Sequence, residues 1–484
     1  MGISKEYLHL VLSLKVSWLR QQGEYSLAEL SKKSGLSQSY LNDIERGRKY
    51  PSPGKILELA EALNVSYDEL ISLKLSGKLA PLSALLNSSV MQEIPFEIFG
   101  FTRSDLINLM TGSPEKFATF TDSVMKVTQK YGVEIDEFIE AAIRSYKELH
   151  YLSFPDIDQK ATDFLKGITA DLTISTLESW LSSEHRYQIH KQQLDKDTEL
   201  SELPYIYFAG AKPRLYLNNK LSATEMLFTL CQIAGYEYLG LQERMASGEF
   251  SDQATFDQIR NRERSFLFAM NLIAKAYTDE NHFQPFAEMT KCNFPTLEKL
   301  LNSIPMPIKA SVPFLMRILH SKYGVQNMFY QHYEVPRERS EISLREELHF
   351  GESLPFSENI PNAHHCRRLT GVISDTDSNG VFRTSPLHSD ESYVVWRFSE
   401  RSSVKNGIED RILLGIKDEL STRKKLAFIS DYSLSNFESH NHCESCPIAN
   451  CEQRAADPTI HKKSVKRERM RKAIENLFSK NQNA

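Results

Sequence analysis

The chain has 484 residues, of which 41% are hydrophobic and 25% are charged, and its mean hydropathy is -0.40. This length allows two to four domains with sizeable cores. No apolar run approaches the roughly 18 residues of a transmembrane helix, and the N-terminus lacks the features of a signal peptide. The net charge of -5 gives no global indication of nucleic-acid binding. We therefore expect a cytoplasmic protein without a membrane partner.

Residues 26–71 contain short amphipathic segments around a glycine. Gly35 lies between two of them, where a turn with positive φ costs glycine little. Ser26 and Glu29 fit a capping box at the start of the first helix. This pattern predicts a helix-turn-helix. The side chains expected to pack its two helices together are Leu27, Leu30, Leu36, Leu41 and Ile44.

The second helix of this motif is expected to begin at Ser37 and to present a polar face. Glutamine and asparagine amides can pair bidentately with adenine in the major groove, whereas arginine and lysine contact phosphates. Double-stranded DNA is therefore the expected partner. The predicted DNA-binding residues are Gln38, Ser39, Tyr40, Asn42, Arg46, Arg48 and Lys49. With its ERGRKYPS stretch the segment resembles XRE-family (Cro/repressor-like) domains, which implies a homodimer on a two-fold symmetric site.

Residues 73–159 are expected to form a helical spacer that also serves dimerisation. Apolar residues recur at three- and four-residue spacing in 114–131 and 134–149, which favours helices. The stretch 150–158 breaks this pattern. We place a domain boundary there.

Residues 160–290 are expected to form an α+β domain. The predicted elements after its first helix are strands near 205–210 and 213–219 and helices near 222–245 and 254–277. The stretch FTLCQIAGY resembles the helix of ImmA/IrrE-type metallopeptidases, for which FTLAHELGH is typical. The resemblance implies a degenerate peptidase-like domain.

The residues needed for zinc hydrolysis are replaced in this helix. The motif works because two histidines four residues apart bind zinc, while the glutamate beside the first acts as base. Gln232 and Tyr236 stand in place of the histidines, and Ile233 in place of the glutamate. The third ligand aligns with Arg264, or with Glu263 after a one-residue shift. We therefore expect no enzyme; the segment is either plain core or a former cleft whose Gln232, Tyr236 and Arg264 bind a ligand.

Residues 291–460 are expected to form a C-terminal sensor domain, with helices and proline-containing loops up to about 360. After 365, strands are predicted over GVIS, GVFRT, SYVVWRF, RILLGIK and KLAFISD, with a tight turn at 377–380. The tail, 461–484, is expected to be a basic amphipathic helix, either a solvated face or a surface for DNA or a CoA phosphate.

The fold class expected from these elements is mainly α. It comprises an N-terminal helix-turn-helix bundle (1–72), the helical spacer, the degenerate peptidase-like α+β domain, and a C-terminal α+β part with a small antiparallel sheet.

Three cysteines lie close together in HNHCESCPIANCEQRAADP, residues 440–458. A C-x2-C spacing is common in zinc sites, where a tight turn brings two thiolates to one ion. Three cysteines leave one ligand missing, which a nearby histidine or Cys366 could provide. The alternatives are reduced, partly buried thiols or an iron–sulfur cluster. The predicted zinc ligands are Cys443, Cys446, Cys451 and Cys366.

The domain order and the motif CESCPIANCEQRAADP resemble the short-chain fatty acyl-coenzyme A regulators, a group of bacterial transcription factors. This resemblance implies that a short-chain acyl-CoA binds in the peptidase-like and C-terminal domains and alters DNA affinity. An alternative is a phage-type repressor or antitoxin-like regulator, in which the degenerate domain binds a partner protein rather than a small molecule.

Overall fold

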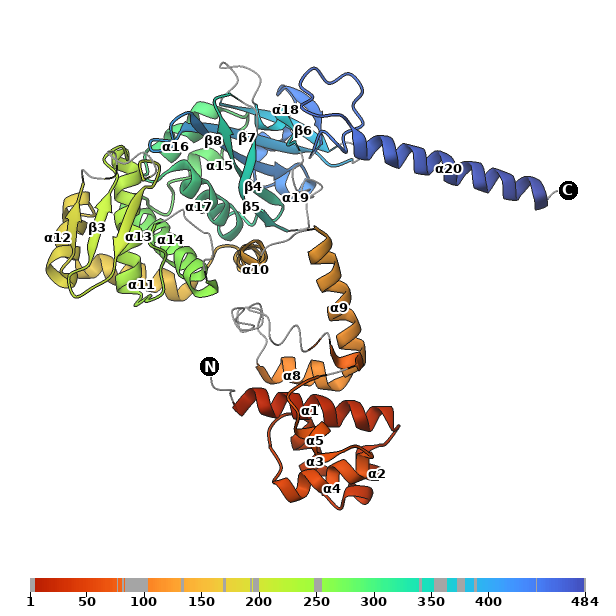
Figure 1. Ribbon diagram of the computed structural model, residues 1–484. Coiled ribbons are helices and arrows are strands. Elements are labelled where there is room, and N and C mark those ends of the chain that lie inside the picture. Colours follow the sequence, from red (N-terminus) through yellow and green to blue (C-terminus); the bar gives the residue numbers. More distant parts are fainter. Residues whose placement is uncertain are drawn as a thin grey trace. The chain divides into compact units, whose positions relative to one another are not determined.

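The computed structural model is mainly helical, with an α+β part towards the C-terminus (Figure 1). The chain divides into two compact units, residues 1–140 and 141–484. In the part of the chain that is described, no helix combines the length and apolarity needed to cross a bilayer. The structure describes residues 5–75, 77–80, 82, 103–131, 135–168, 171–191, 194, 200–247, 255–338, 342–351, 364–371, 379–386, 390–440 and 442–482.

The first unit is built around its N-terminal helix, α1. One side of α1 places Leu12 and Val16 in the core of the helix-turn-helix, and the other places Val11 and Leu14 against α8 and α9. The helix therefore belongs to two cores at once. The helices of this unit are α1 (Lys5–Gln22), α2 (Leu27–Ser34), α3 (Gln38–Glu45), α4 (Pro53–Leu63), α5 (Tyr67–Ile71), α8 (Arg103–Gly112) and α9 (Pro114–Tyr131).

The predicted helix-turn-helix is confirmed at its turn and at its cap. Gly35 ends α2 in the left-handed region with φ 70°. The amide of Glu29 donates to the Ser26 hydroxyl at 3.2 Å, and the amide of Ser26 donates to the Glu29 carboxylate at 2.7 Å. Of the five predicted core side chains, four are buried and Leu27 is partly buried.

Polar contacts of Arg20 and Lys15 join α1 to the helix-turn-helix. Arg20 donates to both carboxylate oxygens of Glu45 at the end of α3, at 2.6 and 2.9 Å. This hydrogen bonding raises the pKa of Arg20. The Lys15 ammonium donates to the carbonyl of Glu69 at 2.6 Å and to that of Ser72. These bonds fix the positions of α3 and α5 relative to α1.

The second unit begins within α10 (Ile135–Leu149) and continues into the predicted peptidase-like region. The predicted strand pair is confirmed as β2 antiparallel to β3. A third strand, β1, pairs parallel with β3 and was not predicted, because its three residues show no periodicity. The elements of this region are α11 (Pro155–Gly167), α12 (Ile174–His185), β1 (Gln188–His190), β2 (Tyr205–Phe208), β3 (Arg214–Leu217), α13 (Ala223–Tyr238) and α14 (Phe256–Tyr277).

Helices α13 and α14 pack closely because of a glycine. A Cβ placed on Gly235 would lie 2.9 Å from the Cδ1 atom of Phe268, so a larger residue there would push the two helices apart. The predicted end of this helix near 245 was wrong. α13 stops at Tyr238, and Gly240 follows with φ 66°.

A six-stranded sheet with the order β5-β4-β8-β7-β6-β9 forms the other part of this unit. All neighbouring strands are antiparallel except β6 and β9, which are parallel. Helices α15–α17 precede it in the chain and lie beside it (Figure 1). The elements are α15 (Gln284–Ala287), α16 (Phe294–Asn302), α17 (Ile308–Ser321), β4 (Met328–Pro336), β5 (Ser343–Phe350), α18 (Arg367–Thr370), β6 (Gly380–Pro386), β7 (Tyr393–Arg401), β8 (Ile408–Lys417), α19 (Leu420–Arg423), β9 (Asn436–Ser439) and α20 (Thr459–Gln482).

Two predictions for this region were wrong. Helices and loops were expected up to 360, yet β4 and β5 begin the sheet at Met328; β4 is buried along most of its length and so lacks an alternating pattern. The KLAFISD stretch is not a strand but contains a 3-10 helix, Ala427–Ser430. The GVIS strand beyond Gly371 and the first half of the turn at 377–380 lie outside the described residues.

One hydrophobic core runs through the second unit, from Leu152 to Ile429. The ring of Phe286 on α15 lies 5.4 Å from that of Trp396 on β7 and 4.9 Å from that of Phe428, measured between centroids. Residues on both sides of the predicted boundary at 290 therefore share a core. The division between units falls at residues 140 and 141, within α10, whereas the sequence pattern breaks at 150–158.

Candidate nucleic-acid interface and C-terminal pocket

Helix α3 presents the predicted base-reading residues. The hydroxyl of Ser37 caps the helix by accepting the amide of Tyr40 at 3.3 Å. Gln38 and Ser39, in the first turn, are exposed, and Asn42 is half-buried one turn further on. The two amide side chains thus lie four residues apart on a short helix that starts at a defined position, which is suited to contact with base edges in the major groove.

The predicted cationic cluster follows α3. Lys49 lies 2.9 Å from a carboxylate oxygen of Asp43, and this hydrogen bond lowers the pKa of Asp43. Arg46 and Arg48 are exposed, and neither forms an ion pair with any other described residue. These two guanidinium groups are therefore the ones best placed to contact phosphates, while the charge of Lys49 is partly neutralised.

Lys55 on α4 is a further cation close to α3, and the sequence did not indicate that it lies there. The ring of Tyr40 is half-buried, and the Lys55 ammonium lies 4.2 Å from its centroid. The Lys49 ammonium lies 5.5 Å from the same centroid. Two lysine ammonium groups thus lie near the Tyr40 ring, close to the start of the predicted recognition helix. Because Lys55 belongs to another helix, only the folded arrangement shows it beside α3.

The three residues predicted to line the former peptidase cleft have different surroundings. Tyr236 is buried, hydrogen-bonds with Ser265, and has the Arg244 guanidinium 5.2 Å from its ring; burial raises the pKa of Tyr236. Gln232, one turn earlier on α13, is half-buried. Arg264 pairs with Asp156 of α11 at 2.8 Å and is partly exposed. The ion pair thus directs Arg264 towards α11.

The neighbouring Glu263 is a largely buried acid. Its carboxylate lies 2.8 Å from the ammonium of Lys147 on α10, which also lies 2.7 Å from Glu346 on β5. The side chain of Lys147 is 8% exposed. Burial alone would lower the pKa of Lys147, but the two carboxylates raise it above its ordinary value. The ammonium therefore stays charged and balances two acids.

Two further contacts fasten α10 to β5. Arg144 lies 2.8 Å from Glu347, and Glu148 accepts the backbone amide of His349 at 2.8 Å. Lys147 and Glu148 follow Arg144 by three and four residues, so both neighbour Arg144 on one face of the helix. These contacts between α10 and β5 could not be predicted from the sequence, because Lys147 and Glu346 are 199 residues apart.

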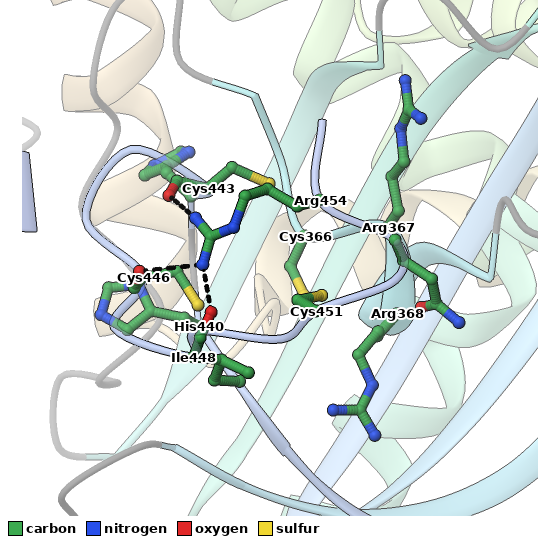
Figure 2. A pocket seen from close by; sticks show the side chains of 11 residues that line it. Cys366, Arg367, Arg368, His440, Cys443, Cys446, Ile448, Cys451 and Arg454 are labelled. Carbon is green, nitrogen blue, oxygen red and sulfur yellow. Dashed lines mark hydrogen bonds between the residues drawn. The ribbon is translucent and has the colours of Figure 1, made fainter. Parts of the chain in front are cut away.

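A pocket at the C-terminal part of the second unit collects all four predicted zinc ligands (Figure 2). It contains about 330 Å³ of empty space, part of which is open to solvent. Its walls come from the segment around α18 and from the cysteine-rich loop. The lining residues are Cys366, Arg367, Arg368, His440, His442, Cys443, Cys446, Ile448, Cys451, Gln453 and Arg454.

Arg454 holds the cysteine-rich loop in shape. Its guanidinium donates to the carbonyl of Cys443 at 2.8 Å, to that of Cys446 at 3.3 Å, and to that of Ile448 (Figure 2). The loop is joined to the distant segment before α18, because the amide of Cys443 donates to the carbonyl of His364 at 2.9 Å. Cys366 and the three C-terminal cysteines, predicted as zinc ligands, thus line one pocket.

The thiols of this pocket receive backbone hydrogen bonds. The amide of Ala455 lies 3.3 Å from the Cys443 sulfur. Burial raises the pKa of Cys366, although three backbone amides, including that of His440, act in the opposite direction. Among the described residues, no three His, Cys, Asp or Glu side chains are placed so as to hold a metal ion together. The four thiols therefore line one space without converging on one point.

Sequence similarity to known proteins agrees with the N-terminal geometry. A solved "Mycobacterium tuberculosis transcriptional regulator" is 11% identical, with a TM-score of 0.44 over 66% of this chain and 93% of that chain. The "uncharacterized HTH-type transcriptional regulator y4dJ" of Sinorhizobium fredii is 43% identical over 54 residues, 11% of this chain and 70% of that protein. Residues 16–70 match the HTH_3 family, described as helix-turn-helix. The chain therefore belongs to the family of HTH-type transcriptional regulators.

Proposed function

We propose that this regulator changes its DNA affinity when a ligand binds to its second unit. The observation that carries the proposal is the C-terminal pocket, which lies in a different unit from the helix-turn-helix and is built from two segments far apart in sequence. A ligand that prefers one conformation of these segments can shift the population of DNA-binding states by as much as its differential affinity.

The ligand class we propose is a short-chain acyl-CoA. Three arginines, Arg367, Arg368 and Arg454, line the pocket, and guanidinium groups suit the phosphates of such an anion. Arg454 donates to the loop carbonyls, so Arg367 and Arg368 are the two arginines whose substitution tests this assignment. The resemblance of CESCPIANCEQRAADP to the acyl-CoA regulators supports the same assignment.

A DNA-shift titration with acetyl-, propionyl- and butyryl-CoA and with free CoA tests this function. We expect one thioester to change the apparent DNA affinity at least several-fold, while free CoA does not. Arg367→Gln/Arg368→Gln should abolish the response and leave DNA binding without ligand intact. If DNA binds and no thioester has an effect, the assignment is wrong, and a partner protein bound by the degenerate domain becomes the better explanation.

We further propose zinc as the occupant of the cysteine pocket. Four thiols line one space, and amides donate towards their sulfurs, as outer-shell hydrogen bonds do in thiolate metal sites. Because the thiols do not converge in this structure, zinc binding would draw them together onto one ion. We expect elemental analysis to find about one zinc per chain, and Cys443→Ser/Cys446→Ser to lose it. Cys231→Ala, which removes the buried thiol of α13, should keep the metal. Equal metal content in both variants would contradict the site. Finding iron with inorganic sulfide instead of zinc would assign the pocket to an iron–sulfur cluster.

Homodimerisation through the first unit is the third part of the proposal. Leu109 on α8 is 57% exposed and Phe120 on α9 is 64% exposed, so both offer apolar surface for a second copy of the chain to cover. Burying one phenylalanine contributes about 1.5–3 kcal/mol, and a two-fold interface contains two copies. Phe120→Glu should therefore raise the dimer dissociation constant at least about tenfold by sedimentation velocity. Leu420→Glu in the second unit, at a position that is 73% exposed, is the matched control. An unchanged dimer in Phe120→Glu excludes this face.

A further inference from the structure

Helix α20 concentrates positive charge in a chain that is otherwise acidic. Residues 461–484 hold eight of the 58 lysines and arginines but only two of the 63 acidic residues. Residues 1–72, by contrast, contain nine basic and nine acidic residues, so the helix-turn-helix has no net cationic excess. Every lysine and arginine from 462 to 472 is exposed.

The charges on α20 are sorted onto two sides of the helix. Glu468 lies 2.9 Å from Arg471 and 3.7 Å from Lys472, and Glu475 lies 3.9 Å from Arg471. These residues share one side and neutralise one another. The other side carries basic residues at spacings of three and four, which places them next to each other along the helix. This cationic face consists of Lys462, Lys463, Lys466, Arg467 and Arg469.

The cationic face is almost unpartnered. Lys462 lies 3.6 Å from the exposed Asp457. Within the described part of the chain, the other four side chains make neither a hydrogen bond nor an ion pair. The face extends over eight residues, or about 12 Å of helix. Five like charges within this length repel one another, and a polyanion with closely spaced charges would relieve that repulsion.

We propose that the cationic face of α20 binds the phosphate backbone of double-stranded DNA and adds a second contact to that of the helix-turn-helix. DNA carries about one negative charge per 1.7 Å of helix axis, so several phosphates lie within the length of the face. Sequence is read by α3, whereas α20 supplies affinity that does not depend on sequence. The proposal does not depend on the identity of the effector.

DNA is favoured over an anionic membrane surface because α20 has no apolar side opposite its cationic face. A helix that lies on a bilayer buries a continuous apolar side opposite its basic side. Between Thr459 and Arg469 the apolar side chains are Ile460 and Val465, which are five residues apart and so point in different directions on a helix. The exposed Met470 and Ile474 follow Arg467 at successive spacings of three and four, so they continue the cationic side rather than form an opposite one. The helix therefore offers charge without a separate insertion surface.

The test compares two double variants of the full chain that each remove two positive charges from α20. Lys466→Gln/Arg469→Gln changes the cationic face, and Arg471→Gln/Lys472→Gln changes the paired side. Binding to a random-sequence duplex of about 60 base pairs is measured at several salt concentrations, and helix content is checked by circular dichroism. Each phosphate contact contributes about 0.9 to the slope of log affinity against log salt. We expect the first variant to lower the slope by about 1–2 per chain and the control to leave it unchanged.

Two results would overturn the proposal. If both variants give the same slope of log affinity against log salt, α20 contributes to DNA binding only through its overall charge or not at all. Loss of binding to phosphatidylglycerol vesicles in Lys466→Gln/Arg469→Gln, with unchanged DNA binding, would assign the face to a membrane surface instead.

Discussion

Replacing Lys147 with methionine is expected to lower the free energy of unfolding of the second unit by about 3 kcal/mol. The ammonium balances Glu263 and Glu346 in a largely buried setting, and removing one partner of a buried ion pair typically costs about 3–5 kcal/mol. We expect the lower end of this energy range, because Arg262 remains 3.3 Å from Glu263. Urea unfolding followed by tryptophan fluorescence in a Trp18→Phe background measures the change, since the remaining tryptophans lie in the second unit.

Arg264→Met is the matched control for this prediction. It removes the partly exposed pair with Asp156, and such pairs contribute at most about 1 kcal/mol. The double variant Lys147→Met/Glu263→Gln should recover part of the loss, because no uncompensated acid remains buried at that position. Equal losses in Lys147→Met and Arg264→Met would show that the buried pair does not stabilise the unit.

The same network gives a pH dependence with a defined sign. Burial alone would raise the pKa of Glu263, but Lys147 and Arg262 together lower it below its ordinary value of 4.5. A lowered carboxyl pKa stabilises the fold fully above about pH 4.5, and this contribution is lost as the pH falls through the lower, folded-state value. Unfolding measured between about pH 6 and pH 3 should therefore show a steeper acid loss in the wild type than in Lys147→Met.

Asn42→Ala is expected to weaken binding to a selected operator by roughly 5- to 150-fold. A bidentate amide–adenine pair contributes about 1–3 kcal/mol of base discrimination. Gln38→Ala should act similarly, since Gln38 is exposed in the first turn of the same helix. Neither change removes a charge, so binding to random-sequence DNA should stay within about twofold. Competition titrations with a duplex selected from a random library give both affinities.

Arg46→Gln/Arg48→Gln separates phosphate contacts from base reading. These exposed guanidinium groups are expected to touch phosphates, so the variant should weaken specific and random-sequence binding alike and lower the salt slope by about 2. If Asn42→Ala and the double arginine variant reduce both kinds of binding to the same extent, α3 is not the recognition helix.

The parts of this fold that the sequence predicted are those specified locally. The turn at Gly35 and the box between Ser26 and Glu29 depend on residues within one or two helical turns, and both were confirmed. The C-x2-C spacing likewise pointed to a cysteine site, and Cys366 was found in the same pocket.

The parts that could not be predicted depend on long-range packing. β4 is buried on both faces, so it has neither the alternation of a half-exposed strand nor flanking signals that distinguish it from a helix. The seam between α10 and β5 joins side chains such as Lys147 and Glu346 that are 199 residues apart. No spacing rule connects residues at that distance, so only the assembled core reveals the pair.

The position of α1 between two cores bears on how this protein can be divided. A fragment ending near residue 72 would contain every predicted base- and phosphate-contacting residue of the helix-turn-helix. It would also leave Val11 and Leu14 without the side chains of α8 and α9 that cover them. Such a minimal fragment should be prone to self-association, whereas one that continues through α9 should behave as a tractable, transplantable DNA-binding module.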